Sequence, residues 1–96
     1  MASVDYAPRA LADLERLVDF LMEADPASAG ETFDLIESAV SVLERHPMIG
    51  RPVEAGLREL VISRGRTGYL AIYRYDEARD RVLVLAVRHQ REAGYT

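Results

Sequence analysis

Residues 46–95 read HPMIGRPVEAGLRELVISRGRTGYLAIYRYDEARDRVLVLAVRHQREAGY, and this stretch decides the fold. It contains three runs rich in β-branched and aromatic residues, at 57–63, 69–75 and 81–89. Such runs are typical of strands, and both connections between them have the length and the turn residues of hairpin loops. The stretch therefore predicts an antiparallel meander of three strands.

The third run is apolar in both of its alternating sets, which indicates a central strand. Two helices can cover only one face of a sheet, so the other apolar face is expected to be open to a partner or to the C-terminal tail. The tyrosines at 69, 73 and 75 share one strand face and are expected in the core or lining a groove. The alternating sets are Val82, Val84 and Ala86 on one face and Leu83, Leu85 and Val87 on the other.

The N-terminal half predicts a short strand and two helices. Residues 3–6 form the strand candidate, and apolar residues then recur every three or four positions over about 8–23, as in an amphipathic helix. Asp25 and Pro26 supply an N-cap and a first-turn proline for a second helix that runs to about residue 45. A connection this short predicts an antiparallel helical hairpin.

The predicted architecture is α+β with the order β-α-α-β-β-β. An antiparallel meander sheet carries the α-helical hairpin on one face, within a single domain over residues 1–96. Most helix acids, including Asp13 and Asp19, fall outside the apolar stripes and are expected on the solvated face.

Composition excludes several classes of protein. The chain has no cysteine and two histidines, so neither disulfides nor a structural metal site is expected, and we expect no cofactor. No apolar run has the length of a membrane span, and the N-terminus has no signal core. We therefore expect a cytoplasmic protein that does not enter a membrane.

Charge is divided unevenly along the chain. Residues 1–44 hold two arginines and ten acids, whereas residues 45–96 hold ten arginines and six acids. All twelve cations are arginine, whose planar fork suits carboxylate and phosphate. This asymmetry predicts that the second half binds an anionic partner.

With these elements in order, the chain resembles the RelE/ParE superfamily of type II toxin–antitoxin toxins over nearly its whole length. No single segment is specific to the superfamily, but the order of the segments and the distances between them are. The segments that carry the resemblance are YAPRALADL at 6–14, HPMIGRPV at 46–53, LREL at 57–60, AIYRY at 71–75 and VLAVRHQR at 84–91.

The resemblance implies a toxin that is neutralised by a cognate ParD-like or RelB-like antitoxin. In the superfamily the antitoxin's C-terminal segment lies along the toxin's sheet and helices, and a homodimer or a toxin–antitoxin hetero-oligomer is expected. An apolar, acidic tail would complement the open sheet face and the arginines. The residues expected to bind antitoxin or target are Arg58, Arg64, Arg66, Tyr73, Arg74, Arg88, His89 and Arg91.

The superfamily contains at least two toxic activities. RelE-like members are ribosome-dependent ribonucleases that cut mRNA, whereas ParE-like members inhibit DNA gyrase and have no catalytic residues. A metal-independent ribonuclease needs an acid or base, a proton donor and phosphate-binding cations. The residues that could supply them are His89, Arg91, Tyr95 and Arg88, with Arg51, Arg58 and Arg74 as further phosphate ligands.

The net charge of −4 and the absence of lysine do not favour a protein that must bind ribosomal RNA. The His-Pro-x-x-Gly-Arg-Pro-Val loop and the Leu-Arg-Glu-Leu segment are more similar to ParE. We therefore predict a non-enzymatic gyrase inhibitor, with the ribonuclease as the alternative and a non-toxic antitoxin-binding module as the second alternative. Glu59 is the expected acidic partner of Arg74 or Arg88.

Overall fold

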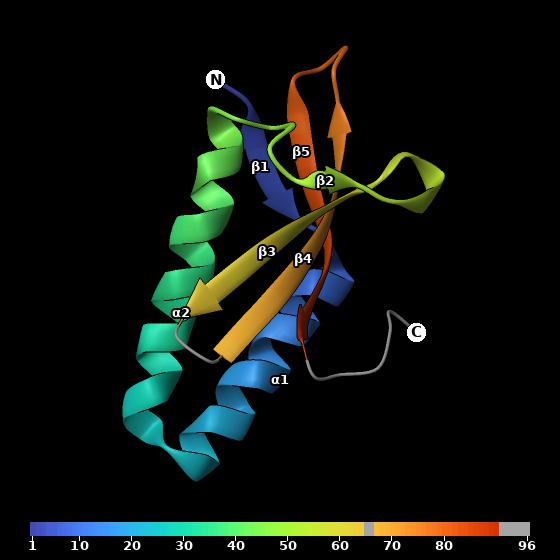
Figure 1. The fold of residues 1–96 in the computed structure, drawn as a ribbon. Helices are drawn as coiled ribbons and strands as arrows, with labels where there is room; N and C mark the ends of the chain where they lie inside the picture. Colours follow the sequence, from blue (N-terminus) through green and yellow to red (C-terminus); the bar gives the residue numbers. More distant parts are fainter. Residues whose placement is uncertain (65–66, 91–96) are drawn as a thin grey trace.

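A helical hairpin lies against one face of a five-stranded sheet in the computed structural model, which describes residues 1–64 and 67–90 (Figure 1). The side chains of 63, 64 and 67 are outside this description. The molecule is elongated, with principal extents of 42 × 26 × 26 Å. The order of elements confirms the predicted α+β fold.

The two helices begin where the prolines predict. Helix α1 spans Pro8–Ala24 and α2 spans Pro26–Ser41, and each has its proline in the first turn. Asp25 occupies the N-cap position of α2, but its carboxylate accepts a hydrogen bond from the Ser28 hydroxyl at 2.7 Å instead of capping a backbone N–H. The α-helix ends earlier than predicted, because residues 42–44 form a 3₁₀ turn.

The sheet confirms the meander and adds two strands to it. Strands β3, β4 and β5 are antiparallel neighbours, and the full order is β1-β5-β4-β3-β2. The sequence did not predict the place of β1, which pairs in parallel with β5, or the two-residue strand β2 at the opposite edge. The strands are β1 (Ser3–Tyr6), β2 (Arg51–Pro52), β3 (Arg58–Arg64), β4 (Thr67–Asp76) and β5 (Arg81–His89).

A β-bulge in β5 changes which side chains enter the core. Tyr73 pairs with Val84 and Ile72 pairs with Ala86, so Leu85 is the extra residue between them. The predicted strict alternation along β5 is therefore wrong after residue 84. Val87 joins the core that Val82 and Val84 line, while Ala86 lies outside this cluster.

The core lies between the helical hairpin and one face of the sheet. Its strand residues come from β3, β4 and β5, and Tyr69 and Tyr73 belong to it, as the shared face of the tyrosines predicts. On the other face, Val61 is 50% exposed, whereas Ile72 is 8% exposed and lines a hollow with Val53 and Leu57. The apolar face away from the helices is therefore covered in part by the segment that follows β2.

Asp13 connects α1 to the free edge of β5. Strand β1 pairs with β5 as far as Val84, and beyond it the Val87 N–H donates to the Asp13 carboxylate at 3.0 Å. The same carboxylate accepts hydrogen bonds from Arg16 at 3.3 Å and Arg88 at 3.4 Å. Asp13 is 3% exposed, so the prediction of a solvated position is wrong for this residue.

We expect Asp13→Asn to lower the free energy of unfolding by roughly 3 kcal/mol, because it removes the negative charge that faces a guanidinium only 12% exposed. Urea denaturation measures the effect. Asp19→Asn, an exposed change on the same helix, is the matched control and should leave the midpoint nearly unchanged. Equal midpoints for both variants would show that Asp13 has no special role.

Candidate functional site

The loop at residues 46–50, called the His–Pro loop below, is held by side chains from two strands. Arg58 on β3 donates hydrogen bonds to the backbone oxygens of Met48 at 3.0 Å and Gly50 at 2.8 Å. The Gly50 N–H donates to the hydroxyl of Tyr73 on β4 at 2.9 Å. Within the loop, the Ile49 N–H donates to the His46 carbonyl at 3.1 Å. The loop backbone is therefore fixed to the sheet.

Tyr73 is a structural residue of this loop. Its side chain is 0% exposed, and burial raises the pKa of its hydroxyl above the usual value, so the group is neutral near pH 7. Its predicted place on a binding surface is wrong, because the ring lies in the core and only the hydroxyl reaches the His–Pro loop.

Glu59 and Arg51 form an ion pair at the β2 edge. Glu59 is 5% exposed, and its carboxylate accepts from Arg51 Nε at 2.8 Å. Arg51 keeps 71% of its side chain exposed. Arg88 is paired with Asp13 and not, as predicted, with Glu59, because its guanidinium bends around the β5 edge toward α1.

The two neighbouring candidates at the end of β5 have different surroundings. Arg88 is directed to Asp13, whereas the His89 ring meets the Tyr69 ring edge-to-face with centroids 5.3 Å apart. Of the predicted ribonuclease row, Arg91 and Tyr95 lie outside the described residues.

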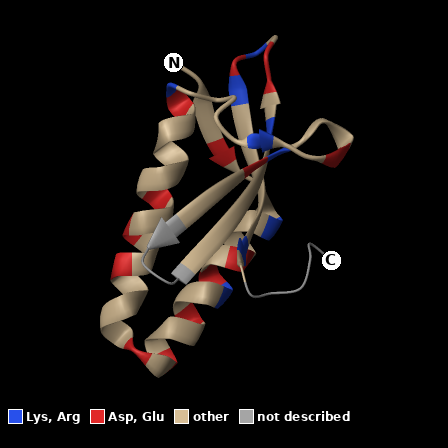
Figure 2. Ribbon diagram, in the orientation of Figure 1, with Lys and Arg blue, Asp and Glu red and all other residues tan. Residues whose placement is uncertain are grey.

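Arg74 is the predicted binding residue that reaches solvent on β4. It is exposed and lines a shallow hollow with Asp5, Arg79 and Arg81. Arg79 is bound to Asp76 at 3.0 Å, which lowers the pKa of that carboxyl. Figure 2 shows arginines on the strands and acids along both helices, as the division of charge predicts. The side chains of Arg64 and Arg66 are outside the described part.

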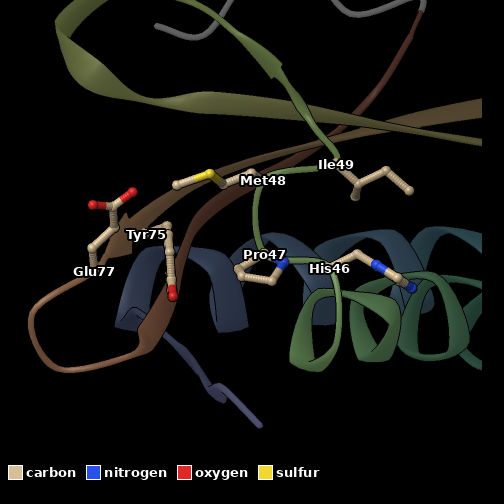
Figure 3. Close-up of a pocket in the computed structure, with 6 residues that line it drawn as sticks. All are labelled: His46, Pro47, Met48, Ile49, Tyr75 and Glu77. Atoms are coloured by element: carbon tan, nitrogen blue, oxygen red, sulfur yellow. The ribbon is translucent and has the colours of Figure 1, made fainter.

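A second hollow lies beside the His–Pro loop (Figure 3). Met48 lies above Tyr75 and Glu77, while Ile49 and His46 extend toward the other end. The predicted binding residues do not include this surface, although adjacent Met and Ile in a Pro/Gly loop are a signal for it. The lining residues are His46, Pro47, Met48, Ile49, Tyr75 and Glu77.

Within residues 1–64 and 67–90, no cluster of three or more His, Asp or Glu residues has the arrangement of a metal site. No helix in that part of the chain has the length and apolar character needed to cross a membrane.

The sequence and the fold match toxins of type II toxin–antitoxin systems. The family model described as the ParE toxin of the type II toxin–antitoxin system parDE matches residues 4–94. The chain therefore belongs to the ParE toxin family, within the RelE/ParE superfamily.

Two relatives from Caulobacter vibrioides have RelE names. Toxin RelE3 is 38% identical over 93 residues, covering 96% of this chain and 98% of the relative. Toxin RelE1 is 38% identical over 66 residues, covering 69% of this chain and 71% of the relative.

Solved structures give the same fold. The chromosomal ParDE system from P. aeruginosa matches with a TM-score of 0.78 at 25% identity, over 93% of this chain and 96% of that chain. The RelBE2 complex from Mycobacterium tuberculosis matches with a TM-score of 0.61 at 28% identity, over 93% and 98%. Isolated E. coli RelE, at 14% identity and a TM-score of 0.65 over 97% and 88%, is similar in fold alone.

We expect Gly50→Ala to lower the free energy of unfolding by about 1–3 kcal/mol. An added Cβ would lie 2.7 Å from the Tyr73 ring and 2.9 Å from the Glu59 backbone oxygen. Gly30→Ala is the control, because no atom beyond its own stretch of helix lies within 4 Å of an added Cβ, and alanine favours the α2 interior by up to about 1 kcal/mol. Thermal or urea unfolding compares them, and a Gly50→Ala protein as stable as wild type would contradict the tight packing.

Proposed function

We propose that this type II toxin acts as a ParE-like inhibitor of DNA gyrase, by binding and without chemistry of its own. The observation that carries the proposal concerns two arginines that a ribonuclease could use to bind phosphate. Both are already engaged in contacts within the fold. Arg88 is paired with buried Asp13, and Arg58 donates to two carbonyls of the His–Pro loop. Both groups serve the fold, so neither is poised to hold a scissile phosphate.

Electrostatics support the same proposal. A protein that binds ribosomal RNA gains much of its affinity by neutralising phosphates. This chain has a net charge of −4, and its helical layer carries acids along its length (Figure 2). The phosphates of rRNA would repel the protein if it approached with that side. Binding to a protein target does not require a positively charged surface.

The ribonuclease remains the second candidate, because both Caulobacter relatives are named RelE toxins. Its remaining acid or base is His89, which is half-buried against Tyr69. A third reading is a non-toxic module whose partner is the antitoxin alone. It differs from both toxins in leaving growth unaffected.

A cognate antitoxin is the expected partner in every reading, since solved neighbours are toxin–antitoxin complexes. We propose that an acidic, apolar C-terminal segment of a ParD-like or RelB-like antitoxin follows the sheet face that carries Val61 and Arg74. Val61 offers apolar surface there and exposed Arg74 offers a cation. A gyrase inhibitor would act in the cytoplasm, where a hetero-oligomer with the antitoxin would hold it inactive.

Parallel assays of purified toxin separate the two activities. We expect inhibition of supercoiling when DNA gyrase and relaxed plasmid are titrated with the protein, and no cleavage of mRNA on programmed ribosomes. His89→Ala should weaken gyrase inhibition only if the surface around His89 contacts gyrase, because a binding toxin needs no acid or base at this position.

Ribosome-dependent cleavage that His89→Ala abolishes, with supercoiling unaffected at saturating protein, would establish the ribonuclease instead. If neither assay responds and expression does not slow growth, the module that only binds antitoxin is the correct reading.

A further inference from the structure

An apolar groove lies between the two helices of the hairpin. Leu11 on α1 is 53% exposed and Phe33 on α2 is 41% exposed, and both line the groove together with the half-buried Val18. The buried side chains of Leu14 and Ala29 form its floor. Single exposed apolar residues are common, but a continuous apolar surface bordered by charged residues is typical of a protein-binding site. The groove is therefore a candidate surface for a partner.

Gly30 keeps the groove open. It lies inside α2, where glycine is less favourable than alanine by roughly 1 kcal/mol. An added Cβ would have no atom from beyond its own stretch of helix within 4 Å, and the φ of Gly30 is not positive. Neither close packing nor the backbone conformation requires glycine at this position. The missing side chain instead leaves space in the groove, which Gly30 lines.

The charged side chains that line the groove are all acidic. Glu15 and Asp19 are one turn apart on α1, and Asp34 lies on α2 (Figure 2). All three are exposed, and in the part of the chain that the structure describes none of them has an ion pair. Carboxylates on both walls are complementary to an occupant that carries cations on both sides of an apolar stripe. They repel an acidic antitoxin segment, a nucleic acid and an anionic membrane surface.

The walls also select the conformation of the occupant. Both walls are helices, whose backbone N–H and C=O groups are bonded within each helix, so the groove offers no backbone partners to an extended segment. A helical occupant satisfies its own backbone and can lay an apolar stripe between two helices. The eight residue steps from Leu11 to Asp19 span about 12 Å, which is roughly two turns of a helix lying alongside.

A second copy of the chain is a poorer occupant on grounds of charge. Two identical hairpins that met through this groove would bring the same three carboxylates of each copy to one interface. Like charges that face each other across an interface are unfavourable. The charge of the groove therefore favours a different protein.

We propose that the groove between α1 and α2 binds a cationic amphipathic helix of a partner protein. The apolar stripe of that helix contacts Leu11, Val18 and Phe33, while its lysines or arginines face the carboxylates on the two walls. The site belongs to the helical layer and is separate from the sheet face proposed for the acidic antitoxin segment. It does not depend on gyrase being the target of the toxin.

The probe is a synthetic peptide of about 18 residues, long enough to form a helix, with leucines at every third and fourth position and lysines beside them. One comparison peptide has glutamate in place of each lysine, and another has the same composition as the probe in an order without an apolar stripe. Fluorescence anisotropy measures their affinities for the purified full chain. We expect saturable binding of the cationic helix, at least about tenfold tighter than that of either comparison peptide.

Two pairs of variants test the apolar contacts. Gly30→Met places a side chain in the groove and should weaken binding about tenfold or more, whereas Gly30→Ala should stay within about twofold of wild type. Both residues favour a helix interior more than glycine does, so both proteins should fold. Phe33→Ser should also weaken binding about tenfold, whereas Phe20→Ser, at a position of α1 that is 67% exposed and does not line the groove, should have no effect.

A third pair tests the charges. Glu15→Gln/Asp34→Asn should weaken binding about fivefold at low salt, because it removes carboxylates from both walls. Its matched control, Glu54→Gln/Glu77→Gln, changes the net charge equally through exposed acids outside the groove and should bind as wild type does. Added salt should reduce the difference between the two.

Equal affinities of the three peptides would overturn the proposal, and so would unchanged binding by both Gly30→Met and Phe33→Ser. Tighter binding of the glutamate peptide would make an acidic segment the occupant. If the wild-type protein is a dimer in light scattering and Gly30→Met is a monomer, the groove is occupied by a second copy of the chain, which also overturns the proposal.

Discussion

The arrangement of the two layers depends on the hydrogen bond between the Asp13 carboxylate and the backbone of β5. This carboxylate takes the place of a strand partner at the β5 edge, where β1 has ended and α1 has begun. An unpaired backbone N–H in this position would be costly, because the edge is buried under a helix. One side chain thus satisfies the backbone, neutralises Arg88 and sets where α1 lies on the sheet.

The same constraint separates structural arginines from available ones. Arg88 and Arg58 form an ion pair and hydrogen bonds within the fold, whereas Arg74 and Arg45 are exposed at the surface. A count of arginines along the strands therefore overstates the cationic surface open to RNA. The surface that remains is mixed in charge and carries apolar side chains on a fixed loop, which is the composition of a protein-binding site.

Local patterns predicted the helices, the meander and the strand at residues 3–6, because period and turn chemistry are properties of neighbouring residues. The parallel pairing of β1 with β5 was not predictable in this way, since its partners are far apart in the chain. The bulge at Leu85 was not predicted, because a strict alternation of side chains assumes a strand without an inserted residue. Asp13 has the helix position of a solvated acid, and only the placement of β5 beside α1 shows that it is buried.

Parallel pairing between the first and last strands has a consequence for synthesis. Ser3 faces Arg81, and the Asp13 carboxylate meets an amide 74 positions later in the chain. A nascent or truncated chain that lacks the last strand leaves β1 unpaired and removes the sheet partner of α1, which then has α2 to pack against. Such non-local contacts form late and slowly. The native fold of this toxin therefore forms only after nearly the whole chain is made.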